Sequence, residues 1–102
     1  MENKKPHLKP DLNLKDLSKE LNLTSIQLSE IINKGFGMNF NDFVNTYRID
    51  EMKAAFQEGK HKHLSLVGIA YDSGFNSKAT FNRVFKKLTG SSPSEYIKSI
   101  DV

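Results

Sequence analysis

Residues 71–87 read YDSGFNSKATFNRVFKK, which is the pattern of a helix end, a tight turn and a second helix. Gly74 suits the left-handed backbone that ends many helices, and Ser77 is a residue type that caps a helix start. Phe75 lies between them as an apolar plug, and every charged residue after the turn is basic. The stretch therefore predicts two short helices around a turn, the second with a positively charged face.

The same pattern occurs earlier in the chain, with Asn22 in the place of Gly74. Counting 52 residues on aligns the apolar positions before the turn: Leu12, Leu14, Leu17 and Leu23 fall on Leu64, Leu66, Ile69 and Phe75. Counting 53 residues on aligns the positions after it: Thr24, Leu28, Ile31, Ile32, Gly37 and Phe43 fall on Ser77, Phe81, Val84, Phe85, Gly90 and Tyr96. The extra residue falls in the turn, where an insertion costs least. We therefore predict a duplicated unit of helix, turn and helix.

The fold class follows from the spacing of the apolar residues, which is helical almost throughout, without the alternation of a half-buried strand. We predict an all-α fold in which two helix-turn-helix units are joined by a long linker helix, with about six to seven helices in all. The predicted helices are a first around Leu14, Leu17 and Leu21, a second from Thr24 to Lys34, the linker from about Asn41 to Glu58, and three more at Ser65–Asp72, Ser77–Leu88 and Pro93–Ile100.

Polar residues mark two of these helix starts. Asn39 with Asp42 begins the linker helix, and Ser92 with Pro93 and Glu95 combines a cap, a first-turn proline and a capping-box acid. The apolar positions expected inside are Phe43, Tyr47, Met52, Ala55 and Phe56 in the linker and Phe81, Val84, Phe85 and Leu88 in the helix after the second turn. The predicted division is a linker segment (1–11), the first helix-turn-helix (12–38), the linker helix (39–59) and the second helix-turn-helix with a C-terminal helix (60–102).

Composition limits the class of protein. A chain of 102 residues has room for one domain with one modest core. The absence of cysteine excludes disulfides and thiolate metal sites, and it fits a reducing, cytoplasmic setting. No apolar run approaches the roughly 20 residues that cross a bilayer, and residues 1–10 lack the apolar part of a signal peptide, so a soluble chain is expected.

The net charge of +3 is unevenly distributed. Residues 1–40 contain six basic and five acidic residues, residues 41–59 two and four, and residues 60–102 seven and three. Positive charge is therefore concentrated around the second helix-turn-helix. An enzyme is not expected: His61 and His63 form a polar loop without a neighbouring carboxylate, and no phosphate-binding glycine motif is present. No cofactor or metal is predicted.

Two short helices around such a turn suggest DNA binding, because the second helix of a helix-turn-helix enters the major groove. A linker helix of roughly 18 residues is about 27 Å long at 1.5 Å per residue. Adding the width of the helices it joins separates the two recognition helices by about 34 Å, one turn of B-DNA. One monomer would then read two adjacent major grooves with its recognition helices near 24–34 and 77–88.

The stretches LSEIINKGFGMNFNDFVNTYRIDEMK (28–53) and IAYDSGFNSKATFNRVFKKLTGSSPSEYI (69–97) resemble the DNA-binding domain of the AraC/XylS family of bacterial transcription regulators, over about residues 10–100. The resemblance implies sequence-specific binding of double-stranded DNA and regulation of transcription, at the nucleoid. The opening KKPHLKPDLNLKDLSKEL also resembles the segment that joins such domains to a preceding sensor region. We therefore expect the output domain of a larger regulator, monomeric by itself, with dimerisation and ligand response in regions outside this chain.

On the second recognition helix the outward side chains are the candidates for DNA contact. Arg83 is suited to bidentate contact with guanine, and Asn82 to adenine or a phosphate. The base-contact candidates are Lys78, Ala79, Asn82 and Arg83, and the phosphate-contact candidates are Ser77, Thr80, Lys86 and Lys87, with Lys78 also suited to a phosphate. The alternative is a solvated basic face that touches nothing.

The first recognition helix is less typical, because Glu30 stands where Arg83 stands in the second copy and where family members often carry arginine. Glu30 either accepts a hydrogen bond from cytosine N4 or, as we favour, pairs with Lys34 at i, i+4, which is worth about 0.2–0.5 kcal/mol. Ile26 suits a thymine methyl group. The base-contact candidates are Ser25, Ile26, Gln27, Ser29 and Glu30, and the phosphate-contact candidates are Asn33 and Lys34.

Two helix starts just after the recognition helices offer backbone N–H groups to phosphate. The candidate phosphate clamps are Asn39 with Asn41 and Ser92 with Ser94, and ordinary capping explains them equally well. The rival function is a helical protein-interaction module whose basic face meets an acidic partner, with RNA polymerase as the candidate.

Overall fold

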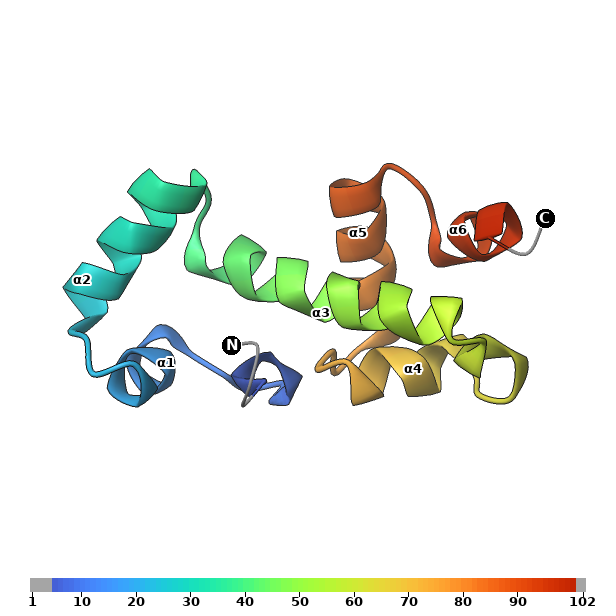
Figure 1. Ribbon diagram of the computed structural model, residues 1–102, viewed down its shortest axis with the longest axis horizontal. Coiled ribbons are helices and arrows are strands. Elements are labelled where there is room, and N and C mark those ends of the chain that lie inside the picture. The colour runs from blue at the N-terminus through green and yellow to red at the C-terminus, as the bar shows by residue number, and fades with distance from the viewer. Residues whose placement is uncertain (1–4, 101–102) are drawn as a thin grey trace.

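A computed structural model describes residues 5–100, which form an elongated, all-helical domain of 44 × 23 × 23 Å (Figure 1). No strand occurs in this part of the chain. The α-helices are α1 (Leu14–Glu20), α2 (Ser25–Glu30), α3 (Phe40–Gln57), α4 (Leu66–Asp72), α5 (Lys78–Thr89) and α6 (Pro93–Ile100). Short 3-10 turns lie at Pro6–Leu8 and Lys60–Lys62, and a π-helical turn at Ile31–Gly35. The predicted all-α fold is confirmed.

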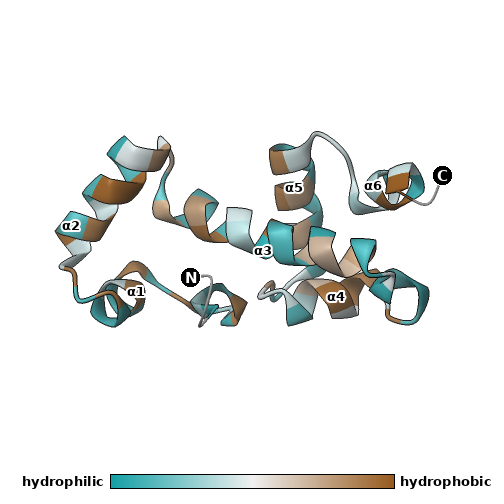
Figure 2. Ribbon diagram, in the orientation of Figure 1, coloured by the Kyte–Doolittle hydropathy of each residue, from teal (hydrophilic) through white to brown (hydrophobic). Residues whose placement is uncertain are grey.

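The long helix α3 runs through the middle of the domain, with α1 and α2 at one end and α4, α5 and α6 at the other (Figure 1). Its start packs on the first cluster of buried apolar residues, which is formed by Leu17, Leu28 and Ile32. Its later turns belong to a second, larger cluster: Ile49, Met52, Phe56, Ile69, Ala70, Phe75, Phe81, Val84 and Phe85. Figure 2 shows apolar (brown) segments in α3, α4 and α5 at this end. One helix therefore joins two separate cores, so the single core expected from the chain length is wrong.

The helix starts at which the sequence predicts a cap are capped as expected. The backbone N–H of Gln27 donates to Thr24 Oγ1 at 3.1 Å, and Thr24 N–H donates to Gln27 Oε1 at 2.9 Å, which completes a capping box. Asn39 Oδ1 accepts from the Asp42 N–H at 2.8 Å at the start of α3. These local bonds satisfy N–H groups that have no partner inside the helix, and so they decide where α2 and α3 begin.

The internal duplication is visible in the hydrogen bonds of the two turns. Leu23 N–H donates to Ser18 O at 2.9 Å, and Phe75 N–H, 52 residues on, donates to Ala70 O at 3.0 Å. Asn22 and Gly74 both take a positive φ, of 57° and 105°. Left-handed backbone followed by a buried or half-buried apolar residue is thus repeated at the same place in each unit.

One expectation about the core residues is wrong, at the end of α5. Leu88, which was expected inside, is 37% exposed. Leu21 and Ile31, which helped to mark the first two helices, are 45% and 47% exposed. The recognition helix of the first unit continues one residue past its predicted end at Lys34, because a wider π-helical turn extends it to Gly35.

The KHKH segment is also more ordered than expected. It forms the 3-10 turn Lys60–Lys62, and the half-buried ring of His61 lies edge-on to Phe56 with 5.9 Å between ring centroids. Within α3 the sequence missed Val44 and Ile49, which are buried. No helix of the described residues is long and apolar enough to cross a bilayer.

Candidate nucleic-acid interface

Helix α5 has two opposite faces. Phe81, Val84 and Phe85 are buried against α3, α4 and the Gly74 turn. The opposite face carries only exposed residues, namely Lys78, Ala79, Asn82, Arg83, Lys86 and Lys87. No acidic residue occurs in α5, so this face has an uncompensated run of positive charge within its own helix. A rigid helix with four exposed cations is the surface that a DNA phosphate backbone attracts.

The hydroxyl groups at the start of α5 are engaged in the cap. Ser77 Oγ accepts from the Thr80 N–H at 3.0 Å and donates to Thr80 Oγ1 at 2.8 Å. The hydroxyl hydrogen of Ser77 is therefore committed, whereas that of Thr80 remains free to donate. Of the two hydroxyl side chains predicted to contact phosphate, Ser77 and Thr80, only Thr80 can donate a hydrogen bond without opening the cap.

Lys87 is already paired. Its Nζ lies 3.3 Å from Asp42 Oδ1, so that the end of α5 is joined to the first turn of α3. Lys86, one residue earlier, has no such partner among the described residues and is exposed. The two lysines are therefore not equivalent as phosphate anchors, which the sequence did not indicate.

The recognition helix of the first unit offers fewer free polar groups. The side chain of Gln27 is held in the capping box, Asn33 Nδ2 donates to Ser29 Oγ at 3.3 Å, and Ser25 Oγ lies 3.4 Å from Ser18 Oγ. Ile26 is 74% exposed. Most of the polar candidates on this helix are thus satisfied within the protein, and Ile26 adds an apolar side chain to its outward face.

Glu30 and Lys34 do not form the ion pair that we favoured. Both are exposed, and neither has an ion pair or side-chain hydrogen bond within the described part of the chain. They border an open hollow together with Leu23, Gln27 and Ile31. A spacing of four residues brings two side chains within reach of each other, but at full exposure the pairing gains too little to fix them.

The predicted phosphate clamps coincide with working helix caps. Ser92 Oγ accepts from the Glu95 N–H at 3.2 Å, and Glu95 Oε1 accepts from the Ser92 N–H at 3.0 Å. The pKa of Glu95 is lowered, mainly by the hydrogen bond from the Ser92 backbone and to a lesser degree by the hydrogen bond from the Ser92 side chain. Asn39 holds the same position at α3, whereas Asn41 and Ser94 are exposed and take no part in either cap. Of these four residues, Asn41 and Ser94 keep side chains free for a ligand.

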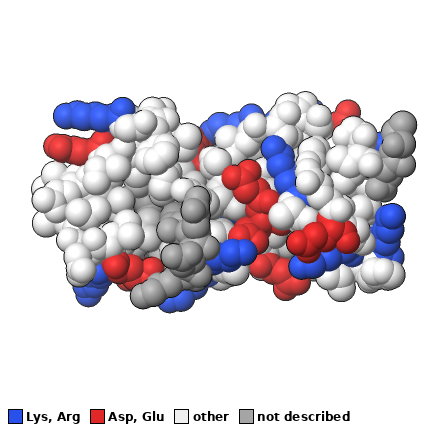
Figure 3. All heavy atoms as spheres, viewed as in Figure 1, with Lys and Arg blue, Asp and Glu red and all other residues white. Residues whose placement is uncertain are grey.

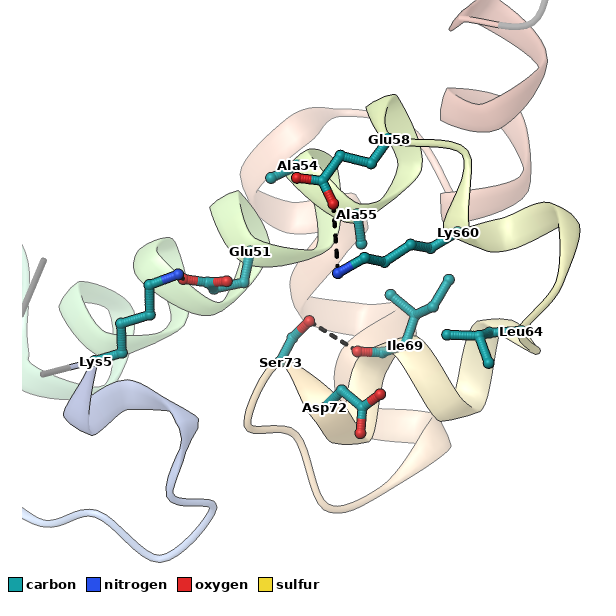
Figure 4. A pocket seen from close by; sticks show the side chains of 10 residues that line it. All are labelled: Lys5, Glu51, Ala54, Ala55, Glu58, Lys60, Leu64, Ile69, Asp72 and Ser73. Atoms are coloured by element: carbon teal, nitrogen blue, oxygen red, sulfur yellow. Dashed lines mark hydrogen bonds and ion pairs between the residues drawn. The ribbon is translucent and has the colours of Figure 1, made fainter. Parts of the chain in front are cut away.

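Acidic side chains gather over α3 and α4 rather than on the exposed face of α5. Figure 3 shows them over the middle of α3 and over α4, on the face turned toward the viewer. Glu51, Glu58 and Asp72 line a pocket of about 280 Å³ between these helices (Figure 4). Among residues 5–100, no group of three or more His, Cys, Asp or Glu is placed to hold a metal ion. Lys5 and Lys60 line the same pocket, so charges of both signs meet there, whereas α5 contains no acid.

The sequence also missed a group of residues at the N-terminal end of the described chain. Residues 5–9, which we call the strap, pass alongside α3, and Arg48 of that helix binds them through two backbone carbonyl groups. His7 of the strap is only 2% exposed and its Nε2 lies 3.1 Å from Glu51 Oε1. The only sequence signal was an arginine in the middle of a helix that otherwise packs on two cores.

Two helix-turn-helix units, each with an outward second helix, define a DNA-binding domain. Comparison with known proteins agrees: residues 17–99 match the family model of a helix-turn-helix domain. The chain belongs to the AraC-type family of helix-turn-helix domains, whose members bind DNA and regulate transcription.

The similar proteins include an uncharacterized HTH-type transcriptional regulator of Staphylococcus aureus (strain COL), 32% identical over 90 residues, which are 88% of this chain and 12% of that protein. The Msm operon regulatory protein of Streptococcus mutans is 28% identical over 89 residues, 87% of this chain and 31% of that protein. This chain therefore spans less than a third of the length of either relative.

Solved structures of the same fold are also similar. The C-terminal domain of AraT, a response regulator from Geobacillus stearothermophilus, has a TM-score of 0.78 and 25% identity, with 93% of this chain and 76% of that chain covered. A protein of unknown function from Listeria innocua has a TM-score of 0.73 and 31% identity, with 91% and 85% covered.

Proposed function

We propose that α2 with its π-helical turn, and α5, enter two adjacent major grooves on one side of a DNA duplex. The observation that carries this proposal is the exposed basic face of α5, which contains no acid. The linker α3 has 18 residues, or about 27 Å of helix, which is compatible with a separation of one DNA turn.

In this arrangement the residues of α5 divide by role. Arg83 contacts guanine in bidentate fashion and Asn82 contacts adenine, because these pairings fit the major-groove edges. Lys78 and Lys86 bind phosphates, which orient the domain without reading sequence. Lys87 contributes less than its charge suggests, since Asp42 lies beside it. Ala79 is small enough for the helix to approach the bases closely.

The first unit reads less sequence than the second. Its polar side chains are engaged in the protein, and Glu30 places a negative charge where α5 has Arg83. Ile26 then makes the main base contact, with a thymine methyl group, and Lys34 with the exposed Asn41 binds the backbone. Ser94 offers the corresponding contact after α5.

The units themselves are assigned as residues 12–38 and 60–102, with residues 39–59 as the linker between them. We propose that this DNA-binding domain is the output part of a longer regulator, monomeric by itself, and that it acts at the nucleoid. The relatives, which are several times longer than the part they share with this chain, support that organisation.

Selection of binding sites from random duplex DNA, followed by titration at several salt concentrations, tests the proposal. Two short boxes one helical turn apart, with affinity falling steeply as salt rises, are the expected result. A single box would mean that the first unit mainly holds the backbone. No DNA binding even at about 50 mM salt would contradict the proposal and favour the rival function, a module that contacts RNA polymerase through its basic face.

A further inference from the structure

The strap is bound to α3 by its own side chains and by side chains of the helix. Lys5 Nζ lies 3.0 Å from Glu51 Oε1, and Figure 4 shows the lysine reaching that carboxylate from the strap. The buried ring of His7 lies against the same carboxylate, and its centroid is 5.5 Å from that of the Tyr47 ring. Pro6 is buried as well. The strap is therefore a packed part of the domain rather than a loose tail.

Arg48 is the central residue of this attachment. Its Nε donates to His7 O and its Nη2 to Lys9 O, each at 2.8 Å, while Nη1 donates to Asn45 Oδ1 at 3.2 Å. The planar guanidinium fork matches two backbone carbonyls at once, which a lysine ammonium cannot do with the same geometry. Burial lowers the pKa of Arg48, yet an arginine keeps its charge at neutral pH. Without the strap, this half-buried cation would lose two acceptors.

The turn of the second helix-turn-helix lies directly against the strap. A Cβ atom at Gly74 would clash with the carbonyl oxygen of His7 and would lie 2.8 Å from Arg48 Nε. The turn residue after it, Phe75, is buried and packs on Phe81 of α5, with 6.4 Å between ring centroids. A continuous chain of contacts thus runs from the strap through Arg48 and Gly74 to the core side of α5.

The first unit provides an internal comparison. Its turn has the same hydrogen bonds, but Asn22, the counterpart of Gly74, is exposed to solvent. Among the described residues, the strap therefore supports one of two otherwise equivalent turns, and it is the turn that precedes the basic recognition helix.

We propose that the strap and Arg48 are positioning elements for DNA binding: the docked strap holds the Gly74 turn and thereby sets the angle at which α5 meets the duplex. Arg48 itself touches no DNA in this arrangement. The proposal rests on the proposed function, since it concerns the helix that reads DNA there.

The first test needs no DNA. Amide hydrogen exchange is measured for the whole chain and for two variants that each remove one positive charge from α3, Arg48→Gln and the matched control Lys53→Gln, whose side chain lies over the Tyr96 ring and away from the strap. The Phe75 amide is expected to exchange about tenfold faster in Arg48→Gln than in the control, because its turn has lost support. The Leu23 amide, its counterpart in the first unit, should not change. Equal responses of the two amides would overturn the proposal.

The second test uses a double-mutant cycle with a selected DNA site. Arg48→Gln is expected to weaken binding about tenfold in the unchanged chain but much less in an Arg83→Ala background, because both act on α5. In an Ile26→Ala background its full effect should remain. The Arg48→Lys variant, which keeps the charge and loses the fork, should behave like Arg48→Gln. If Arg48→Gln weakens binding by the same factor in the Arg83→Ala background as in the Ile26→Ala background, the proposal is overturned.

Failure of this inference is distinguishable from failure of the proposed function. If the unchanged chain binds no DNA, the proposed function is wrong, and the exchange measurement still decides whether the strap holds the turn. If the chain binds DNA and Phe75 exchanges alike in both charge-removal variants, the proposed function stands and the positioning role does not. Circular dichroism of each variant confirms that the helices have formed, and Arg48→Lys serves where Arg48→Gln does not fold.

Discussion

Asp42 in the first turn of α3 and Lys87 near the end of α5 form an ion pair with Nζ and Oδ1 3.3 Å apart, across 45 residues of sequence. The pair is partly exposed, so its contribution to stability is at most about 1 kcal/mol. Its effect on charge matters more. The carboxylate lies beside a cation that would otherwise face solvent at the edge of the α5 surface, and it lowers the positive potential there.

Asp42→Asn is therefore expected to strengthen DNA binding. The change frees Lys87, removes a negative charge, and keeps the backbone N–H that Asn39 caps. One additional phosphate contact should steepen the dependence of log affinity on log salt by about 0.9. Titration at several salt concentrations measures this slope, with Asp50→Asn on the exposed side of α3 as the control for net charge alone. An equal gain in both variants would mean that the pairing with Lys87 is irrelevant.

Arg83→Ala and Lys86→Ala should differ in kind. Loss of a bidentate guanine contact is expected to cost about 1–3 kcal/mol at the selected site and to relax base preference at one position. Loss of a phosphate contact should weaken selected and random DNA alike and reduce the salt slope by about 1. Competition between a selected and a scrambled duplex measures both. A uniform loss in Arg83→Ala would remove its assignment as a base reader.

The buried His7 predicts a pH dependence of stability. Burial is the main reason that the pKa of His7 is lowered; the hydrogen bond and charge of Glu51 oppose it, and the charges of Lys5 and Arg48 add to it. The unfolded chain then binds a proton more readily than the folded one below about pH 6.5, so the free energy of unfolding falls as the pH drops from there toward the lowered pKa.

Glu51 lowers the free energy of unfolding at a more acidic pH than His7 does. Burial alone would raise its pKa, but the hydrogen bonds from Lys5 and His7, together with their charges, hold the pKa below its ordinary value. Its contribution is present above about pH 4.5 and is lost as the pH falls further. Urea unfolding at about pH 7.5 and 5.5 isolates the histidine, and His7→Gln should flatten the difference. An unchanged pH dependence in that variant would show that His7 is not its source.

Gly74→Ala and Gly37→Ala separate backbone strain from steric clash. Both glycines have a positive φ, of 105° and 67°. A Cβ at Gly37 meets nothing within 4 Å, so only the left-handed backbone opposes it, at about 1–2 kcal/mol. A Cβ at Gly74 also meets the His7 carbonyl and the Arg48 side chain, so a clearly larger loss is expected, measured as the free energy of unfolding in urea. Deleting residues 1–9 should remove most of that excess.

Local features of this domain were predictable from sequence. Thr24, Asn39 and Ser92 cap helices because the bonds reach only three residues along the chain, and the duplicated turns follow from apolar spacing and a left-handed residue. Leu88 was misplaced because helical periodicity does not indicate where a neighbouring element ends. The bonds of Arg48 to the strap span 41 and 39 residues, and no local pattern encodes such a contact.

In the candidate site, too, some features were predictable from the sequence and others were not. The exposed face of α5 was predictable from the amphipathic pattern, because its buried side is nearly all aromatic or β-branched. The engagement of Gln27 in a capping box, the pairing of Lys87 with Asp42 and the absence of a Glu30–Lys34 pair were not, since each depends on which of several partners a polar side chain selects. The roles of these residues on DNA remain predictions.

The two hydrophobic clusters are unequal, with three fully buried residues in the first and nine in the second. Because burial of apolar area supplies most of the free energy that opposes chain entropy, we expect the end of the domain containing α1 and α2 to open first, while the remainder stays folded. DNA that engages α2 must then select the closed form, and the heat capacity change on binding will include the folding of this end. If both units read DNA as proposed, α5 is folded before binding and α2 becomes fully ordered only on its DNA site.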